Sequence, residues 1–308
     1  MDIEVRGLVA AEVDAADRIV HDAFGTFLGA DVFGDTALLR TRFGATNTQV
    51  IGAFDAGELI GSSVLTRWGS VAFLGPLSVS PKRWDSGIGR RLVTASLEVF
   101  DAWGVTHQGL FTFADSPRHH GLYQRFDFWP RFLTAIMSRP VTGGEPAPGW
   151  LLSAVEDANR PDLVEACAGV TDALYPGLDA RGEIASVLDQ ALGDVVLVGA
   201  PDDPTGFAVC HHGTGTEAGT GIAYVKFAAV RPGRAAPECF AALLEACAGY
   251  AAAAGAARLV VGVNTARHGA YRHLIRAGFR SDMPGVTMHR ANRPGYDHPD
   301  AYLLDDWR

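Results

Sequence analysis

The chain has 308 residues, 48% of them hydrophobic and 20% charged, a composition that supplies one or two apolar cores and excludes a disordered chain. Because 26 Lys and Arg residues stand against 35 Asp and Glu, the net charge of −9 argues against nucleic-acid and membrane partners. No apolar segment is long enough to span a membrane, no basic signal segment begins the chain, and the four cysteines form no CxxC pair; we therefore expect a cytoplasmic protein without a metal site.

The first half of the chain predicts alternating strands and helices. Strands are expected where apolar residues alternate, at 3–8, 49–55, 58–66, 71–79, 108–113 and 132–138. Helices are expected where apolar residues recur every three or four positions, at 11–24, 87–102 and 116–126. Ala56-Gly57 predicts a tight turn between the second and third strands. This order indicates a mixed α/β unit built on a largely antiparallel sheet.

The second half repeats the same order. It predicts strands at 151–155, 195–200, 206–212, 221–230 and 258–263, and helices at 160–173, 236–254 and 265–277. Val79-x-Pro81 returns as Val230-x-Pro232, and Phe128 returns as Phe279, each 151 residues later. Two landmarks about fifty residues apart thus keep one offset, which indicates an internal duplication. We predict a first unit at 1–142, a Gly- and Pro-rich linker at 143–149 and a second unit at 150–308.

A glycine-containing loop in the first unit suits a pyrophosphate. In LSVSPKRWDSGIGRRLV, residues 77–93, a strand ends and Gly87-Ile88-Gly89 then opens a helix. Glycines let the backbone approach a ligand, and the first turn of a helix offers unpaired N–H groups at the positive end of its dipole. Arg83, Arg90 and Arg91 add positive charge around it. Taken alone, such a loop is also an ordinary turn.

Titratable side chains cluster in the segment 115–132. Tyr123 is expected in mid-helix, where its hydroxyl either donates a proton to a leaving group or packs in the core. Asp115 either collects a proton from an amine or caps the following helix. His119 is a candidate to line a substrate cleft, although a histidine at a helix start is more often a surface or capping residue.

These motifs resemble those of the GCN5-related N-acetyltransferase (GNAT) family, over residues 3–140 and more loosely over 151–290. The resemblance implies two tandem GNAT-like units and acetyl-CoA as co-substrate, and no third ligand at useful spacing near the paired histidines indicates a metal. It implies that Leu77 and Val79 border the pantetheine and that Tyr123 is the general acid. It also implies that the pyrophosphate loop consists of Trp84, Asp85, Ser86, Gly87, Ile88, Gly89 and Arg90. Trp84 replaces the usual Gln or Arg, and Asp127 replaces a usual glycine, which Asp tolerates in a left-handed conformation.

The 151-residue offset predicts that only the first unit is active. It places Glu238 and Phe240 at the positions of Gly87 and Gly89, and Leu274 at that of Tyr123. The second unit therefore lacks both the loop and the tyrosine. Lys226, in the middle of a second-unit strand, must reach solvent, pair with an acid or line a substrate cleft. The aromatic, acidic tail is expected to dock on the fold through Trp307.

Three functions are compatible with these features. The first is an acyl-CoA-dependent N-acyltransferase in which the amine of a small molecule attacks the thioester directly and Tyr123 protonates the leaving thiolate. The second is a non-catalytic acyl-CoA sensor or scaffold, which Trp84 and the absence of an evident general base favour. The third is a tandem transferase that uses an aminoacyl-tRNA, which the net charge of −9 disfavours. The sequence is compatible with a homodimer.

Overall fold

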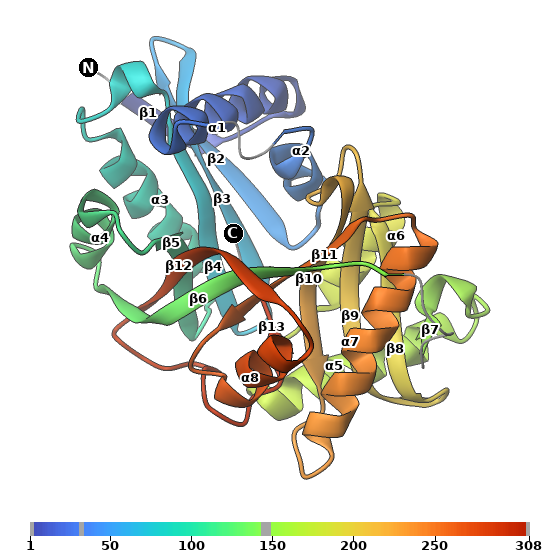
Figure 1. The fold of residues 1–308 in the computed structure, drawn as a ribbon. Helices are drawn as coiled ribbons and strands as arrows, with labels where there is room; N and C mark the ends of the chain where they lie inside the picture. Colours follow the sequence, from blue (N-terminus) through green and yellow to red (C-terminus); the bar gives the residue numbers. More distant parts are fainter. Residues whose placement is uncertain (1–2, 31–33, 143–148, 306–308) are drawn as a thin grey trace.

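One sheet runs through both halves of the chain (Figure 1). The structure is a computed structural model that describes residues 3–30, 34–142 and 149–305. Within these residues the sheet has 13 strands, of which twelve follow the order β1-β2-β3-β4-β5-β12-β6-β11-β10-β9-β8-β7, while β13 pairs with β10. Most of the predicted linker, and also Trp307, lie outside the described residues.

The first unit contains every strand and helix that its periodicity predicts. Its strands are β1 (Ile3–Gly7), β2 (Thr48–Asp55), β3 (Glu58–Trp68), β4 (Val71–Val79), β5 (His107–Phe113) and β6 (Phe128–Pro140). Its helices are α1 (Val13–Leu28), α2 (Leu38–Phe43), α3 (Ile88–Trp103) and α4 (Pro117–Gln124). The helix α2 was not predicted, because six residues are too few for an amphipathic repeat to be recognised. Separate apolar clusters under α1 and under α3 give the sheet a core on both faces.

The second unit follows the same plan with additions. Its strands are β7 (Trp150–Leu151), β8 (Gly193–Ala200), β9 (Asp203–Gly213), β10 (Gly219–Val230), β11 (Arg258–Asn264), β12 (Arg280–Arg290) and β13 (Leu303–Leu304). Its helices are α5 (Arg160–Leu174), α6 (Arg181–Asp189), α7 (Ala236–Ala253) and α8 (His268–Arg276). The expected strand at 151–155 is wrong: two residues of β7 pair with β8, and a 3-10 turn over Leu152–Ala154 then ends it. Sequence periodicity also missed α6, β12 and β13.

The internal repeat keeps its register in three dimensions. The strand β5 spans 107–113 and β11 spans 258–264, so both ends differ by 151 residues. The earlier strands β2 and β8 begin at 48 and 193, a difference of 145. The offset grows from 145 to 151 because the second unit has six additional residues in two places. The β9–β10 connection and β10 itself are each three residues longer than their first-unit counterparts.

The two units exchange their last strands. The strand β6 of the first unit pairs with β11 of the second, and β12 of the second pairs with β5 of the first. The exchanged strands β6 and β12 also pair with each other, so they join the two units in the middle of the sheet (Figure 1). Because backbone hydrogen bonds continue through this seam, the sheet has no boundary that corresponds to the predicted linker.

A buried ion cluster also joins the units, and it corrects the prediction for Lys226. Its ammonium lies 2.6 Å from Glu217 and 2.9 Å from Glu183, and Glu217 in turn accepts two hydrogen bonds from Arg42 of α2. Burial alone would raise the pKa of Glu217, but Arg42 and Lys226 hold it well below its usual range. Lys226 therefore pairs with acids and does not line a substrate cleft.

Candidate active site

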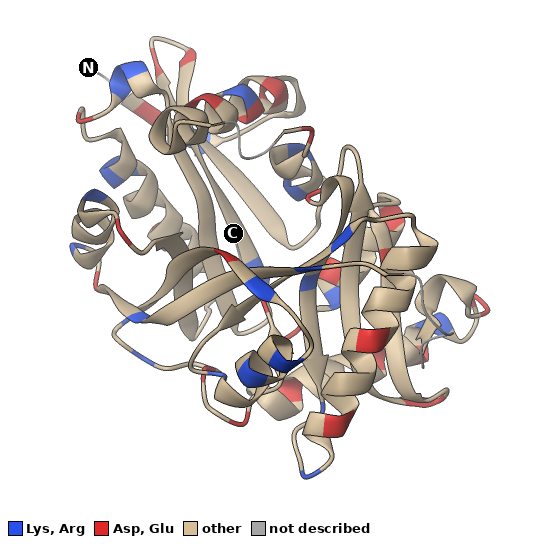
Figure 2. Ribbon diagram, in the orientation of Figure 1, with Lys and Arg blue, Asp and Glu red and all other residues tan. Residues whose placement is uncertain are grey.

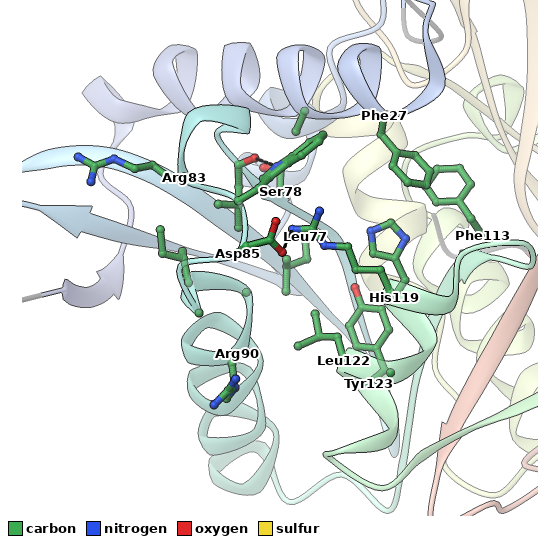
Figure 3. A pocket seen from close by; sticks show the side chains of 18 of the residues that line it. Phe27, Leu77, Ser78, Arg83, Asp85, Arg90, Phe113, His119, Leu122 and Tyr123 are labelled. Carbon is green, nitrogen blue, oxygen red and sulfur yellow. Dashed lines mark hydrogen bonds and ion pairs between the residues drawn. The ribbon is translucent and has the colours of Figure 1, made fainter. Parts of the chain in front are cut away.

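The first unit contains a cavity of about 460 Å³ between α1, α4 and the point where β4 leads into α3 (Figure 3). The described residues that line it include most of those that the resemblance singled out, namely Leu77, Val79, Trp84, Asp85, Gly87, Ile88, Gly89, Arg90, His119 and Tyr123. Ser86 closes the turn instead, because its hydroxyl donates to the carbonyl of Arg83. The sequence therefore identified the cavity, although it did not reveal the aromatic residues contributed by α1.

The cavity exists because β4 and β5 diverge. These parallel strands pair only from Val71 with His107 to Leu74 with Leu110. Beyond that point β5 continues alongside β12, whereas β4 remains bound only to β3. Among the described strands, none therefore pairs with the β5 side of β4 along Leu77 and Val79. Unpaired backbone amides on such an edge can pair with an extended ligand.

The start of α3 requires glycine at one position. Gly87 precedes the helix with φ +83°, a left-handed conformation that costs other residues free energy, and no side chain caps this end. A Cβ at Gly89 would make an ordinary contact of 3.5 Å with Leu122, so that position requires only a small residue. The exposed N–H groups of this helix start form a suitable site for an anion.

Trp84, which departs from the family pattern, and its neighbour Asp85 both contact Arg118. The Trp84 indole N–H donates to the Val79 carbonyl at 2.8 Å. The Arg118 guanidinium lies over the Trp84 ring, 5.2 Å from its centroid, and its nitrogen is 3.2 Å from the Asp85 carboxylate. An arginine therefore balances the acid beside the anion site. Figure 2 shows that Lys and Arg gather on Pro81–Arg83, the start of α3 and α4, whereas α7 carries none.

Tyr123 belongs both to the core and to the cavity. It is 6% exposed, packs in the apolar cluster under α3 and also lines the cavity. Burial raises the pKa of its hydroxyl above the ordinary value of 10, so the group stays protonated at neutral pH. Asp127, which ends this segment, adopts φ +65°, the left-handed conformation expected for a residue in place of glycine.

His119, the candidate for a substrate cleft, lines the cavity, whereas Asp115, the candidate for proton transfer, does not. His119 lines the cavity one helical turn before Tyr123, and its Nδ1 is buried with no hydrogen-bond partner among the described residues. Burial, with a smaller effect of Arg118, lowers the pKa of His119. Asp115 is exposed and is not among the residues that line the cavity. It does not cap α4 either, because Ser116 is the residue that accepts from the His119 N–H.

Comparison with known families accounts for this geometry. Residues 17–128 match the model of the acetyltransferase (GNAT) family, a range that contains β4, the glycine loop and Tyr123. This part of the first unit, residues 17–128, is a GNAT-family domain. No curated protein matches the chain. Among described residues there is no group of three metal-ligating side chains and no helix long and apolar enough to cross a membrane.

Solved structures extend the GNAT likeness to the whole chain. A protein from Pyrococcus horikoshii described as an acetyltransferase is 15% identical, with a TM-score of 0.65 over 97% of this chain and 93% of its own. A GCN5-related N-acetyltransferase from Sphaerobacter thermophilus is 18% identical, with a TM-score of 0.63 over 96% and 98%. A tandem GNAT protein from the clavulanic acid biosynthesis pathway is 14% identical, with a TM-score of 0.57 over 94% and 98%. These likenesses confirm a tandem GNAT fold.

The second unit has the same divergence of strands, but there a short strand covers the diverging edge. Its β10 and β11 pair only from Ile222 with Arg258 to Val225 with Val261. The strand β13 then lies against β10, with Leu304 beside Ala228 and Leu303 beside Ala229. By the 151-residue offset, Ala228 corresponds to Leu77. A segment of the chain itself therefore occupies the position that is an open edge in the first unit.

Buried charges hold β13 in place. Arg267, 2% exposed, donates to the Leu303 carbonyl and to the carboxylates of Asp297 and Asp305 at 2.7 to 3.1 Å. Tyr296 also donates to Asp305. The positions of the catalytic motifs are occupied differently as well: Phe240 and Leu274 are fully buried core residues, and Glu238 is exposed at the start of α7.

Proposed function

We propose that the protein is an acetyl-CoA-dependent N-acetyltransferase that acts on the amine of a small molecule, with the first unit as its active one. One observation carries the proposal: a single cavity connects the start of α3, the open edge of β4 and the hydroxyl-bearing side chain of Tyr123. A long thioester with a diphosphate at one end fits this cavity: the diphosphate would lie at the start of α3, the extended arm along β4 and the thioester near Tyr123. The second unit, whose corresponding edge is covered by β13, serves as a structural partner.

The residues of the cavity fit such a donor. The backbone around Gly87 would hold the diphosphate, and Arg118 limits the repulsion from Asp85. The free edge of β4 would pair with the amides of the pantetheine and orient the acyl carbonyl. No metal is needed for this chemistry, since backbone N–H groups stabilise the oxyanion that develops.

Tyr123 supplies the proton for the leaving group. The amine nitrogen forms a bond to the carbonyl carbon, the carbon–sulfur bond breaks, and the sulfur receives the proton of the Tyr123 hydroxyl. The nitrogen releases one proton to water, and Tyr123 takes one back, which closes the cycle. The raised pKa of Tyr123 keeps this proton in place until a thiolate forms beside it.

A sensor without catalytic activity is the second candidate. The Trp84 indole already occupies the Val79 carbonyl, so part of the β4 edge is not free to pair with a ligand. Asp115, the acid that the sequence suggested as a base, is outside the cavity. These two features favour binding without turnover. The two candidates make the same prediction for binding and opposite predictions for thiol release.

A binding experiment with exchanged residues tests the proposal. Calorimetry is expected to find one acetyl-CoA per chain. The substitution Gly87→Glu installs the second unit's residue at a left-handed position beside the anion site; strain and repulsion together should weaken binding about 100-fold. The control Glu238→Gly should leave affinity within about twofold. Equal effects of both variants, or no uptake by the wild type, would contradict the proposal.

Turnover is then measured as thiol release with a panel of amines that includes 2-phenylethylamine, ethylamine and spermidine. Release that depends on an amine supports the transferase. Binding of acetyl-CoA without release with any amine supports the sensor instead.

A further inference from the structure

Aromatic rings wall one end of the cavity. Phe24 and Phe27 come from α1, Phe113 from the end of β5 and His119 from α4. The ring centroids of Phe27 and Phe113 are 4.9 Å apart, and those of Phe27 and His119 are 5.0 Å apart. Phe24 lies 6.0 Å from Phe113. Figure 3 shows Phe27, Phe113 and His119 together on the side of the cavity opposite Arg83 and Arg90. We call these four residues the aromatic wall.

The aromatic wall is close to the reacting atoms. His119 and Tyr123 are one turn apart on α4, and both line the cavity, so the wall adjoins the hydroxyl that would protonate the leaving group. A molecule in contact with the wall would therefore place a short substituent beside the acyl carbonyl.

The lack of an acidic side chain at the aromatic wall argues against polyamines and other dibasic amines as substrates. The only acidic side chain among the described residues that line the cavity is Asp85, and it pairs with Arg118 near the anion site. His119 has a lowered pKa and is therefore uncharged at neutral pH. A polyamine or dibasic substrate needs a carboxylate to hold its second ammonium group. The wall provides none.

Solvent access indicates which substrate contacts the wall. Phe27 is 38% exposed, which is unusual for a phenylalanine that touches two other rings. The acceptor has to enter from solvent, whereas an acyl group arrives already attached to the donor inside the cavity. A ring that is open to solvent and near the reaction centre suits the acceptor.

We propose that the aromatic wall is the acceptor subsite and that it takes a primary amine carried on an aromatic ring or on an apolar group of similar size. This inference rests on the proposed function. Stacking and edge contacts with Phe27 and Phe113 would hold the ring, and the short arm would carry the amine to the thioester. Neutral His119 adds a planar surface without charge.

The test compares amines that share one reacting group. With acetyl-CoA as donor, kcat/KM should be about 10-fold or more higher for 2-phenylethylamine than for ethylamine or spermidine. Of these three amines, only 2-phenylethylamine places a ring on the aromatic wall. The substitution Phe27→Ala should lower the ratio of 2-phenylethylamine to ethylamine about 10-fold. Phe132→Ala is the matched control: Phe132 is 60% exposed on β6 and is not among the described residues that line the cavity. It should leave the ratio unchanged.

Three results would overturn the inference. The first is a preference for spermidine. The second is an equal loss with both amines in Phe27→Ala. The third is a change, in that variant, of the preference between acetyl-CoA and hexanoyl-CoA while the amine ratio stays constant, which would assign the wall to the acyl group.

The inference can be decided even if the proposed function fails. If no amine is acetylated, binding of 2-phenylethylamine to the wild type in the presence of CoA is measured by calorimetry. Binding that Phe27→Ala abolishes and Phe132→Ala keeps supports an aromatic-amine subsite in a non-catalytic protein. Absence of binding overturns it.

Discussion

In both units the fourth and fifth strands separate at corresponding residues. In the first unit a cavity lies beside the separated edge, and in the second unit another strand covers it. In the first unit the edge of β4 beyond Leu74 faces the cavity. In the second, Leu303 and Leu304 cover the corresponding edge of β10 and are almost completely buried. Buried backbone amides need partners. This fold therefore creates a strand edge that either a ligand or another segment of the chain can cover.

Removing the charge that holds β13 should produce the largest loss of stability. Arg267→Met leaves the carboxylates of Asp297 and Asp305 buried without their cation, which should cost about 3–5 kcal/mol of unfolding free energy in urea titrations. The residue at the corresponding first-unit position is Ser116, since 267 − 151 = 116. Ser116→Ala removes only a helix cap and should cost about 1 kcal/mol. Similar costs for the two variants would show that the ion cluster does not hold the strand.

Changes at the tyrosines of the two units should separate them by activity. Tyr123→Phe removes the proposed proton donor and should lower kcat about 100-fold without changing the affinity for acetyl-CoA. The control is Tyr271→Phe on α8, the counterpart of α4; it should change kcat less than twofold. Because the pKa of Tyr123 is raised, wild-type activity should not decline up to pH 10 through loss of this proton. Unchanged turnover in Tyr123→Phe would remove the residue from the mechanism.

A smaller difference between the two units should appear in how the free energy of unfolding changes at acidic pH. His107 at the start of β5 is buried beside His289, with ring centroids 4.4 Å apart, whereas its counterpart Arg258 pairs with Asp282 at the surface. Burial, and then the neighbouring His289, lowers the pKa of His107 to about 3. Between pH 6.5 and pH 3, therefore, His107 binds a proton in the unfolded chain, where its pKa is about 6.5, but stays neutral in the folded chain. This contribution to stability is complete above pH 6.5 and is lost as the pH falls toward 3.

At pH 5 the loss should be about 2 kcal/mol relative to pH 7 for this histidine. Urea titrations at the two pH values measure it. His107→Gln should reduce the difference between them by that amount, and Arg258→Gln should not change it. The same pH dependence in the wild type and in His107→Gln would show that the buried imidazole is not responsible.

Sequence periodicity was sufficient for the strands of the first unit and for all its helices except α2, and the glycine loop with Tyr123 was sufficient to locate the cavity. Each of those features is local. The helix α2 was missed because six residues contain less than two turns, and β13 because two residues form no pattern. The strand β12 begins with exposed residues and contains Pro284, so nothing in its own sequence reveals that it pairs between β5 and β6.

The side chains that sequence placed wrongly depend on long-range contacts. Lys226 lies in a strand whose pattern permits several roles, and only the approach of Glu183 from α6 and Glu217 from the β9–β10 connection makes it an ion-pair residue. The aromatic wall was missed for the same reason: Phe24 and Phe27 precede Phe113 by more than 80 residues, and each looks like an ordinary core residue in its own segment.

The exchange of β6 and β12 has a consequence for the gene as well as for the protein. A product that ended at residue 142 would carry β6 with neither of its neighbours, and it would expose the edge of β5, so both edges would be open to aggregation. A nick between 142 and 149, in contrast, would leave two fragments interlocked through the sheet. The loss of either half during evolution would therefore leave the other half with unpaired strand edges, which is a reason for both copies to be retained.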